Sequence, residues 1–309
     1  MSERIARVNG LDIAYETFGD PANPPLLLVM GLGAQMILWR DELCELLAGR
    51  GFFVIRFDNR DVGRSSKTRG RPPAVWPGLL GRRITAAYTL DDMADDAVGL
   101  LDELGIGAAH VVGASMGGMI AQTIAARHPD RVLSLTSIMS TTGDKKVGQA
   151  RRRMLPILVR RPPADRDRNV ARAVRVFRAI GSPGFPFDEE GIREVAGRSY
   201  DRCFHPAGAG HQLAAILASG DRTQALRSIE APTLIIHGTH DPLVNVSGAR
   251  ATAEAIPGAE LMLIDGMGHD LPRPVWPRIV DGIEANAQRA GDLCLSPRSP
   301  AVEAGRGGG

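Results

Sequence analysis

Ser115 lies in a short glycine-rich stretch that directly follows an apolar run. Residues 111–118 read Val-Val-Gly-Ala-Ser-Met-Gly-Gly, and residues 119–127 have the composition of a helix. A strand, a tight turn and a helix around Gly-x-Ser-x-Gly form a nucleophile elbow, in which the serine takes a strained corner and the glycines leave room for the bend. Ser115 is therefore a candidate nucleophile. The alternative is a glycine-rich helix start without chemistry, since the chain contains 36 glycines.

A nucleophilic serine needs a base within hydrogen-bonding reach, and the base needs a carboxylate that fixes its tautomer. Asp241 follows the apolar run 233–237, and His269 follows the apolar run 260–264. Because the loops at the carboxyl ends of parallel strands share one edge of a sheet, both residues are expected beside Ser115. The chain order Ser, Asp, His is one in which such triads occur.

Other interpretations of these polar residues remain open. Asp241 could only cap a helix, and His240 could act as the base in place of His269. His237 and His240 look like metal ligands, but no third ligand lies nearby in the sequence. No metal site is expected.

The segments around these residues alternate between strand and helix patterns. Residues 4–19 predict a hairpin that turns at Asn9 and Gly10. Apolar runs predict buried strands at 26–30, 52–57, 111–114, 132–139, 233–237 and 260–264. Helical patterns occupy 39–49, 90–104, 119–127 and 274–289, and residues 66–88 predict an irregular loop. This order predicts an α/β fold with a mostly parallel twisted sheet flanked by helices.

Residues 145–228 interrupt the alternation. They hold helical segments without a convincing strand, which predicts an inserted helical cap over the strand ends, where ligands bind in such sheets. The predicted domains are a core (residues 1–144 and 229–295), this cap and a disordered tail (residues 296–309). Candidate substrate-binding residues are Gly31 and Ala114 in the core and His205 in the cap; packing is the alternative for His205.

The cap carries an excess of positive charge. Residues 145–178 contain twelve Lys or Arg and only two acids. On the helix expected near residues 165–180, one face holds Arg168, Arg172, Arg175 and Arg178, and another holds Val170, Val174 and Phe177. A basic amphipathic helix can bind a membrane surface or an anionic ligand. The interpretation that we favour is a solvated outer face of the cap.

The totals are those of an ordinary globular protein. The chain has 309 residues, 44% of them apolar and 23% charged, and a net charge of +2, which indicates neither nucleic acid nor membrane as partner. Residues 1–10 lack the apolar region of a signal peptide, and no run approaches the roughly 18 apolar residues of a membrane span. The three cysteines are scattered and lack metal-ligand spacing. A reduced cytoplasmic enzyme is expected.

The motifs resemble those of the α/β-hydrolase superfamily over residues 4–290. In family order stand Met-Gly-Leu-Gly at 30–33, Asp-Asn-Arg-Asp-Val-Gly-Arg-Ser at 58–65, Gly-Ala-Ser-Met-Gly-Gly-Met at 113–119, His-Pro-Asp-Arg-Val at 128–132, Gly-Thr-His-Asp at 238–241 and Gly-Met-Gly-His at 266–269. Within the superfamily the chain is most similar to aclacinomycin methylesterases and related bacterial lipases and esterases. Asp-Pro-Ala-Asn-Pro at 20–24 and Gly-Met-Gly-His-Asp-Leu-Pro at 266–272 strengthen that likeness.

The resemblance implies a serine hydrolase that cleaves a carboxylic ester through an acyl-enzyme, without a cofactor. Ser115, His269 and Asp241 would form its triad, and the backbone N–H groups of Leu32 and Met116 its oxyanion hole. Residues 58–65 are expected to brace the rim of this hole through buried hydrogen bonds.

The resemblance also bounds the substrate. It implies an apolar small-molecule ester under the cap, while a serine at position 115 argues against haloalkane dehalogenases and epoxide hydrolases, which place aspartate there. Three alternatives stay open: an enol-lactonase or carbon–carbon bond hydrolase with the same triad, a phospholipase or thioesterase, and a non-catalytic ligand-binding protein.

Overall fold

An eight-stranded sheet forms the centre of the protein in a computed structural model that describes residues 3–79, 82 and 84–295. The expected tail, residues 296–309, lies outside the described residues. The strand order is β1-β2-β4-β3-β5-β6-β7-β8. The strands are β1 (Arg4–Val8), β2 (Leu11–Phe18), β3 (Pro25–Val29), β4 (Phe53–Phe57), β5 (Ala109–Ala114), β6 (Val132–Ile138), β7 (Thr233–Gly238) and β8 (Glu260–Ile264).

Strand pairing is antiparallel only at the β1 edge. The pairs β1–β2 and β2–β4 are antiparallel, and the remaining five pairs are parallel. The predicted hairpin is confirmed: Val8 pairs with Leu11, and the turn between them has positive φ angles of 50° at Asn9 and 78° at Gly10. Asn and Gly tolerate this left-handed backbone, which matches the twist of the flanking strands.

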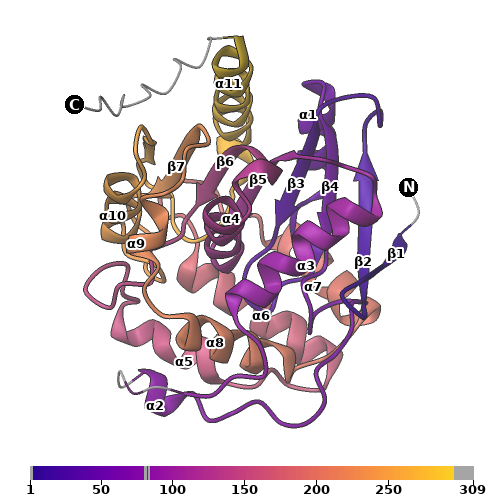
Figure 1. Ribbon diagram of the computed structural model, residues 1–309. Coiled ribbons are helices and arrows are strands. Elements are labelled where there is room, and N and C mark those ends of the chain that lie inside the picture. Colours follow the sequence, from indigo (N-terminus) through magenta and orange to yellow (C-terminus); the bar gives the residue numbers. More distant parts are fainter. Residues whose placement is uncertain (1–2, 80–81, 83, 296–309) are drawn as a thin grey trace, which may run out of the picture.

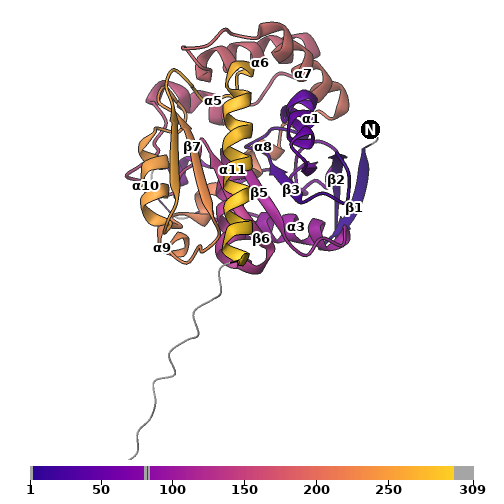
Figure 2. The ribbon, with the colours of Figure 1, turned by 90° about the horizontal axis from the view of Figure 1, so that it is seen from above.

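Helices cover both faces of the sheet (Figures 1 and 2). The α-helices are α1 (Asp41–Gly49), α2 (Trp76–Leu79), α3 (Leu90–Glu103), α4 (Met116–Arg127), α5 (Leu155–Val159), α6 (Arg166–Ile180), α7 (Glu189–Arg202), α8 (Gly208–Ser219), α9 (Thr223–Leu226), α10 (Ser247–Ala255) and α11 (Trp276–Leu295), and the 3₁₀ turns are η1 (Met36–Leu38), η2 (Pro129–Arg131), η3 (Arg152–Met154) and η4 (Arg273–Val275). Helices α3, α4 and α10 bury apolar side chains in one core, and α1 and α11 bury theirs in a second core. The two cores occupy opposite faces of the sheet, because neighbouring residues of a strand, such as Leu27 and Leu28, divide between them.

Most predicted elements are found within two residues of their expected ends. Two helices are longer than predicted. Helix α4 begins at Met116, directly after the elbow serine, and α11 runs to Leu295 because no proline follows before position 297. The loop expected at 66–88 is irregular except for the short helix α2.

The segment between β6 and β7 contains helices α5 to α9 and, among its described residues, no strand. Figure 1 shows α5, α6 and α8 together below the sheet. We call residues 145–228 the cap; their treatment as a separate domain stays a prediction.

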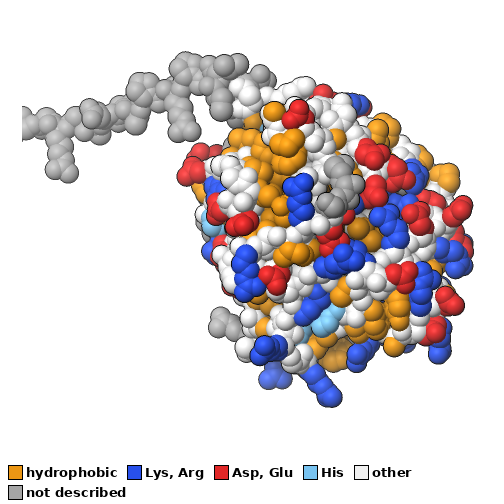
Figure 3. All heavy atoms as spheres, turned by 90° about the vertical axis from the view of Figure 1, so that its right-hand side faces the viewer, with side chains coloured by type: hydrophobic (Ala, Val, Ile, Leu, Met, Phe, Trp, Pro, Cys, Tyr) orange, Lys and Arg blue, Asp and Glu red, His pale blue; other side chains and the backbone are white. Residues whose placement is uncertain are grey.

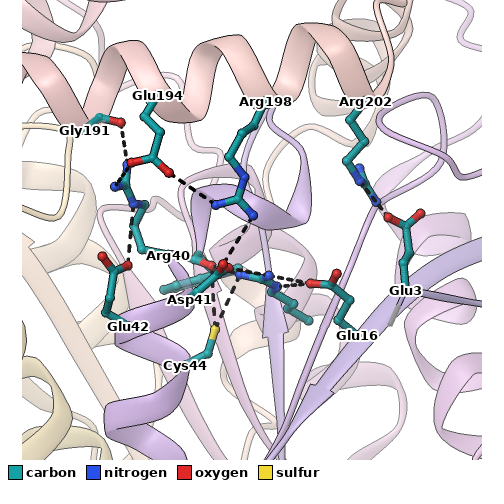
Figure 4. Close-up of polar contacts among 12 residues, drawn as sticks. Glu3, Glu16, Arg40, Asp41, Glu42, Cys44, Gly191, Glu194, Arg198 and Arg202 are labelled. Atoms are coloured by element: carbon teal, nitrogen blue, oxygen red, sulfur yellow. Dashed lines mark hydrogen bonds and ion pairs between the residues drawn. The ribbon is translucent and has the colours of Figure 1, made fainter. Parts of the chain in front are cut away.

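Charged side chains of α7 attach the cap to the core, and Figure 4 shows them pointing toward α1 and β1. Arg198 lies 3.3 Å from Asp41, and Arg202 donates to Glu3 at 2.9 Å. From the core side, Arg40 donates to a backbone carbonyl of α7 at 2.6 Å. These bonds hold α7 above the loop that follows β3.

Candidate active site

Ser115 occupies a strained corner between β5 and α4. Its φ of 57° and ψ of −119° are unusual for a residue with a side chain, and its backbone N–H donates to Ile138 at 2.9 Å. A Cβ atom at position 117 would lie 2.0 Å from the carbonyl oxygen of Val29, and one at position 113 would lie 2.0 Å from the carbonyl oxygen of residue 117. Both positions therefore require glycine, and the sharp bend follows from these close approaches.

The structure brings the three predicted triad residues together. The Oγ atom of Ser115 lies 3.0 Å from Nε2 of His269, and Nδ1 of His269 lies 2.6 Å from Oδ2 of Asp241. The other oxygen of Asp241 accepts the backbone N–H groups of Leu243 and Val244, both at 2.8 Å. With Asp241 and His269 both buried, this arrangement fixes the carboxylate and orients the imidazole toward the serine.

The other two histidines near Asp241 lie differently. His240, the alternative base, has a side chain that is 52% exposed and bonds to the hydroxyl of Thr239 at 2.9 Å. His237 is fully buried and its Nε2 bonds to the carbonyl of Val244 at 2.8 Å. Neither contacts Ser115 within the described part of the chain, so the geometry favours His269 as the base.

Two backbone N–H groups beside Ser115 have no hydrogen-bond acceptor among the described residues: those of Leu32, in the loop after β3, and Met116, at the first position of α4. The N-terminus of a helix adds a positive partial charge at this point. Gly31 packs against the same corner, since a Cβ there would lie 3.2 Å from the Cβ of Ser115. The two N–H groups are suitable donors for an oxyanion.

The loop after β3 is held by the 58–65 motif, as predicted. The buried carboxylate of Asp58 accepts the N–H of Met36 at 2.8 Å, and the amide of Asn59 donates to the carbonyl of Met30 at 2.9 Å. The same motif reaches the hairpin, since Ser65 accepts the N–H of Ala14 at 2.9 Å.

Two glutamines, which sequence reasoning missed, tie this loop to the cap. Gln212 on α8 is fully buried; it accepts the N–H of Gly33 at 2.7 Å and donates to the carbonyl of Arg60 at 2.8 Å. Gln35 donates to two carbonyls near the end of α7, at 2.7 and 2.9 Å, and accepts from Arg202 at 2.7 Å. Neither glutamine belongs to a recognisable motif, so no sequence signal pointed to them.

The loop that carries His269 is also bonded to the cap, through residues 180–184. The N–H of His269 donates to the carbonyl of Ile180 at 2.7 Å, and Ser182 accepts the N–H of Gly268 at 2.8 Å while donating to Asp270. Burial raises the pKa of Asp270, and the hydrogen bond from Ser182 opposes that effect. Cap residues therefore hold both the loop that carries His269, the candidate base, and the loop that carries Leu32, a candidate oxyanion donor.

A cavity of about 960 Å³ opens at Ser115 and extends under the cap. Its wall includes all three predicted substrate-binding residues, Gly31, Ala114 and His205. Burial lowers the pKa of His205, and its Nε2 atom is buried without a partner among the described residues. The volume is large enough for a small organic molecule.

Within residues 3–79, 82 and 84–295, no group of three or more His, Cys, Asp or Glu side chains is placed to hold a metal ion. None of the helices that the structure describes is both long and apolar enough to cross a bilayer.

Comparison with known proteins agrees with the architecture. A profile described as alpha/beta hydrolase fold matches residues 24–272. Two relatives are 32% identical over 94% of this chain and 99% of their own length: rhodomycin D methylesterase DauP of Streptomyces sp. (strain C5) and rhodomycin D methylesterase DnrP of Streptomyces peucetius. The crystal structure of the esterase RhEst1 from Rhodococcus sp. ECU1013 superposes with a TM-score of 0.71 at 22% identity, over 94% of this chain and 100% of that one. The chain belongs to the alpha/beta hydrolase fold family.

Proposed function

We propose that the protein is a carboxylic ester hydrolase of the methylesterase or carboxylesterase type, with Ser115, His269 and Asp241 as its catalytic triad. The observation that carries the proposal is the continuous chain of hydrogen bonds from Ser115 through His269 to Asp241, at 3.0 and 2.6 Å. The similarity to two methylesterases over nearly their whole length supports it.

In the proposed reaction, Oγ of Ser115 attacks the ester carbonyl carbon while Nε2 of His269 takes the hydroxyl proton. Asp241 stabilises the imidazolium that results. The N–H groups of Leu32 and Met116 bind the oxyanion of the tetrahedral intermediate, and His269 returns the proton to the departing alkoxide.

The second half of the reaction releases the acid. Water gives a proton to His269 and attacks the acyl carbon, and Oγ of Ser115 leaves and regains that proton. The products are an alcohol and a carboxylic acid. The ester and one water molecule supply all the atoms of these two products.

The cavity under the cap suggests the substrate's shape. Its wall includes apolar side chains from both the core and the cap, among them Met119, Met139, Phe177, Ile180, Leu213 and Trp276. We propose a small-molecule ester with a bulky apolar part in this space and the scissile carbonyl at Ser115.

The test is turnover of a matched substrate panel by the purified protein and by the Ser115→Ala and Asp241→Asn variants. The panel comprises methyl esters, p-nitrophenyl esters, an enol-lactone, a thioester and a phospholipid. Ester turnover that Ser115→Ala abolishes and Asp241→Asn lowers by up to about 10⁴-fold is expected, because the asparagine amide favours the wrong imidazole tautomer. Turnover confined to the enol-lactone would move the assignment to that alternative, and Ser115→Ala retaining wild-type turnover would refute the mechanism.

A further inference from the structure

Three arginines of the cap line the same cavity as Ser115: Arg152, Arg160 and Arg172. The prediction that the arginines of α6 lie on a solvated outer face is confirmed for Arg168, Arg175 and Arg178, which are exposed. It is wrong for Arg172, which is partly buried in the cavity wall. A helical wheel identifies a shared face of a helix but not where a cavity opens beneath it, which is why the sequence placed Arg172 with the others.

No acid neutralises these three arginines within the described residues. The guanidinium of Arg172 makes one hydrogen bond, to the backbone carbonyl of Arg160 at 3.0 Å. Other arginines of the cap do have acidic partners: Arg166 lies 2.7 Å from Asp201, and similar pairs occur along α7. Cap arginines outside the cavity that also lack an acidic partner among the described residues, such as Arg168 and Arg175, are exposed to solvent, whereas Arg172 is partly buried in the cavity wall.

The carboxylates that line this cavity are engaged by other groups. Asp144 accepts the N–H of Lys146 at 2.9 Å, Asp188 caps the N-terminus of α7, and Asp270 accepts from Ser182. Among the described residues none of them forms an ion pair with the three arginines, and Asp188 instead lies 3.4 Å from Arg273.

Burial lowers the pKa of Arg172, and the positive charges of Arg175 and Arg160 lower it further. All three effects act in the same direction, against the charged form of the side chain. Charges in partly buried sites are ordinarily paired, because unpaired charge there costs free energy. An anion bound beside Arg172 would relieve that cost.

We propose that Arg172, together with the neighbouring Arg160, binds an anionic group of the substrate, so that the preferred ester carries a carboxylate, phosphate or sulfate at a distance from its scissile carbonyl. Guanidinium groups suit this task because their planar donors match the oxygens of such anions. The substrate would then be amphiphilic, with its apolar part against the cavity wall and its charge at the arginines. Figure 3 agrees with a basic character of this side of the molecule: Lys and Arg gather toward the lower edge, the side that the cap occupies in Figure 1.

This inference rests on the proposed function, and its test separates the two. The substrates are p-nitrophenyl hemiesters of α,ω-dicarboxylic acids of about four to twelve carbons, each matched with the neutral p-nitrophenyl ester of the monocarboxylic acid of equal length. Turnover of the neutral esters that depends on Ser115 supports the esterase assignment whatever the arginines do.

The variants are Arg172→Gln and, as a matched control, Arg168→Gln. Both remove one positive charge from α6, but Arg168 is exposed and does not line the cavity. In Arg172→Gln, kcat/KM for at least one hemiester should fall about ten- to a hundredfold, because hydrogen bonds to charged groups are the stronger kind. The matched neutral ester should change less than twofold, and Arg168→Gln should leave both substrates nearly unchanged. In wild type, the preference for the hemiester should weaken between 0.1 M and 1 M salt, as the Debye length falls from about 10 to about 3 Å.

Two outcomes would overturn the proposal. One is a wild-type protein that favours no hemiester over its neutral counterpart at any chain length, or loses both equally in Arg172→Gln. The other is that Arg172→Gln weakens co-sedimentation with phosphatidylglycerol vesicles and leaves hemiester kinetics unchanged, in which case the arginines bind a membrane surface instead.

Discussion

Gln212 connects the cap to the loop that carries one of the proposed oxyanion donors, and its replacement by leucine tests that connection. Its side chain is fully buried, accepts from Gly33 at 2.7 Å and donates to Arg60 at 2.8 Å. Gln212→Leu keeps most of the side-chain volume and removes both bonds. The neighbour of Gly33 in the chain is Leu32, whose N–H is the proposed donor.

The size of the effect follows from the two groups left unpaired. A buried group that loses its partner costs about 1–3 kcal/mol. Gly33 is exposed and Arg60 is only partly buried, so water can replace part of each lost hydrogen bond. The low end of that range, about 1 kcal/mol, therefore applies to each of the two groups. A loss of about 2 kcal/mol in the free energy of unfolding is expected, which corresponds to a decrease in Tm of about 3 °C for a chain of 309 residues.

The catalytic effect is a separate quantity. Complete removal of an oxyanion donor lowers kcat by about 10²–10³-fold. Gln212→Leu leaves the N–H of Leu32 in place but frees its loop, so a partial loss of about tenfold in kcat is expected, with a smaller change in KM.

The assay is steady-state hydrolysis of a p-nitrophenyl ester at a temperature well below the Tm of both proteins. Thermal unfolding is measured separately on the same samples. Gln224→Leu on α9 is the control, since Gln224 is exposed and distant in sequence from the loop. If Gln212→Leu lowers Tm as expected but keeps kcat within twofold of wild type, Gln212 supports the fold and does not position the donor.

Three further predictions concern other parts of the molecule. Ser182→Ala removes the hydrogen bonds to Gly268 and Asp270 and should lower kcat several-fold, because the loop that carries His269 becomes looser. The control Ser228→Ala changes an exposed serine and should leave kcat unchanged. Equal kcat values in the two variants would contradict this prediction. Burial lowers the pKa of His110 from 6.5 to about 4. As the pH falls, His110 is therefore protonated in the unfolded chain before it is protonated in the folded chain. The free energy of unfolding keeps its full contribution from neutral His110 above pH 6.5 and loses up to about 3 kcal/mol of it as the pH falls to about 4. Urea unfolding at pH 7 and pH 5 should show a smaller loss in His110→Gln than in wild type, and equal losses would contradict this. Burial also raises the pKa of the Cys44 thiol to about 12, so mass mapping after iodoacetamide treatment of the native protein should find Cys44 unmodified while Cys203, which lines the cavity, reacts; equal modification of the two would be the contrary result.

The core could be read from the sequence because its strands are buried on both faces. Continuous apolar runs such as 26–30 predict buried parallel strands, and the loops that follow the carboxyl ends of such strands meet at one edge of the sheet. That rule, together with the Gly-x-Ser-x-Gly pattern and the chain order Ser, Asp, His, predicts Ser115, Asp241 and His269 at one edge of the sheet.

The contacts between cap and core could not be predicted in this way. Gln212 and Ser182 bond to backbone groups more than 80 positions away, and a bond of that kind leaves no periodicity or spacing in the sequence. The position of Arg172 depends on the packing of α6 against its neighbours rather than on the helix itself. Tertiary packing decides these features, and the sequence pattern expresses it only weakly.

The most direct test of the account is the identity of the residue that becomes acylated. Rapid mixing with a p-nitrophenyl ester, acid quenching and mass mapping should locate one acyl group on Ser115, with no adduct in Ser115→Ala and slow formation in His269→Gln. The adduct should appear no more slowly than the first turnover, as required of an intermediate. An acyl group on any other residue, or full ester turnover by Ser115→Ala, would contradict the proposed triad.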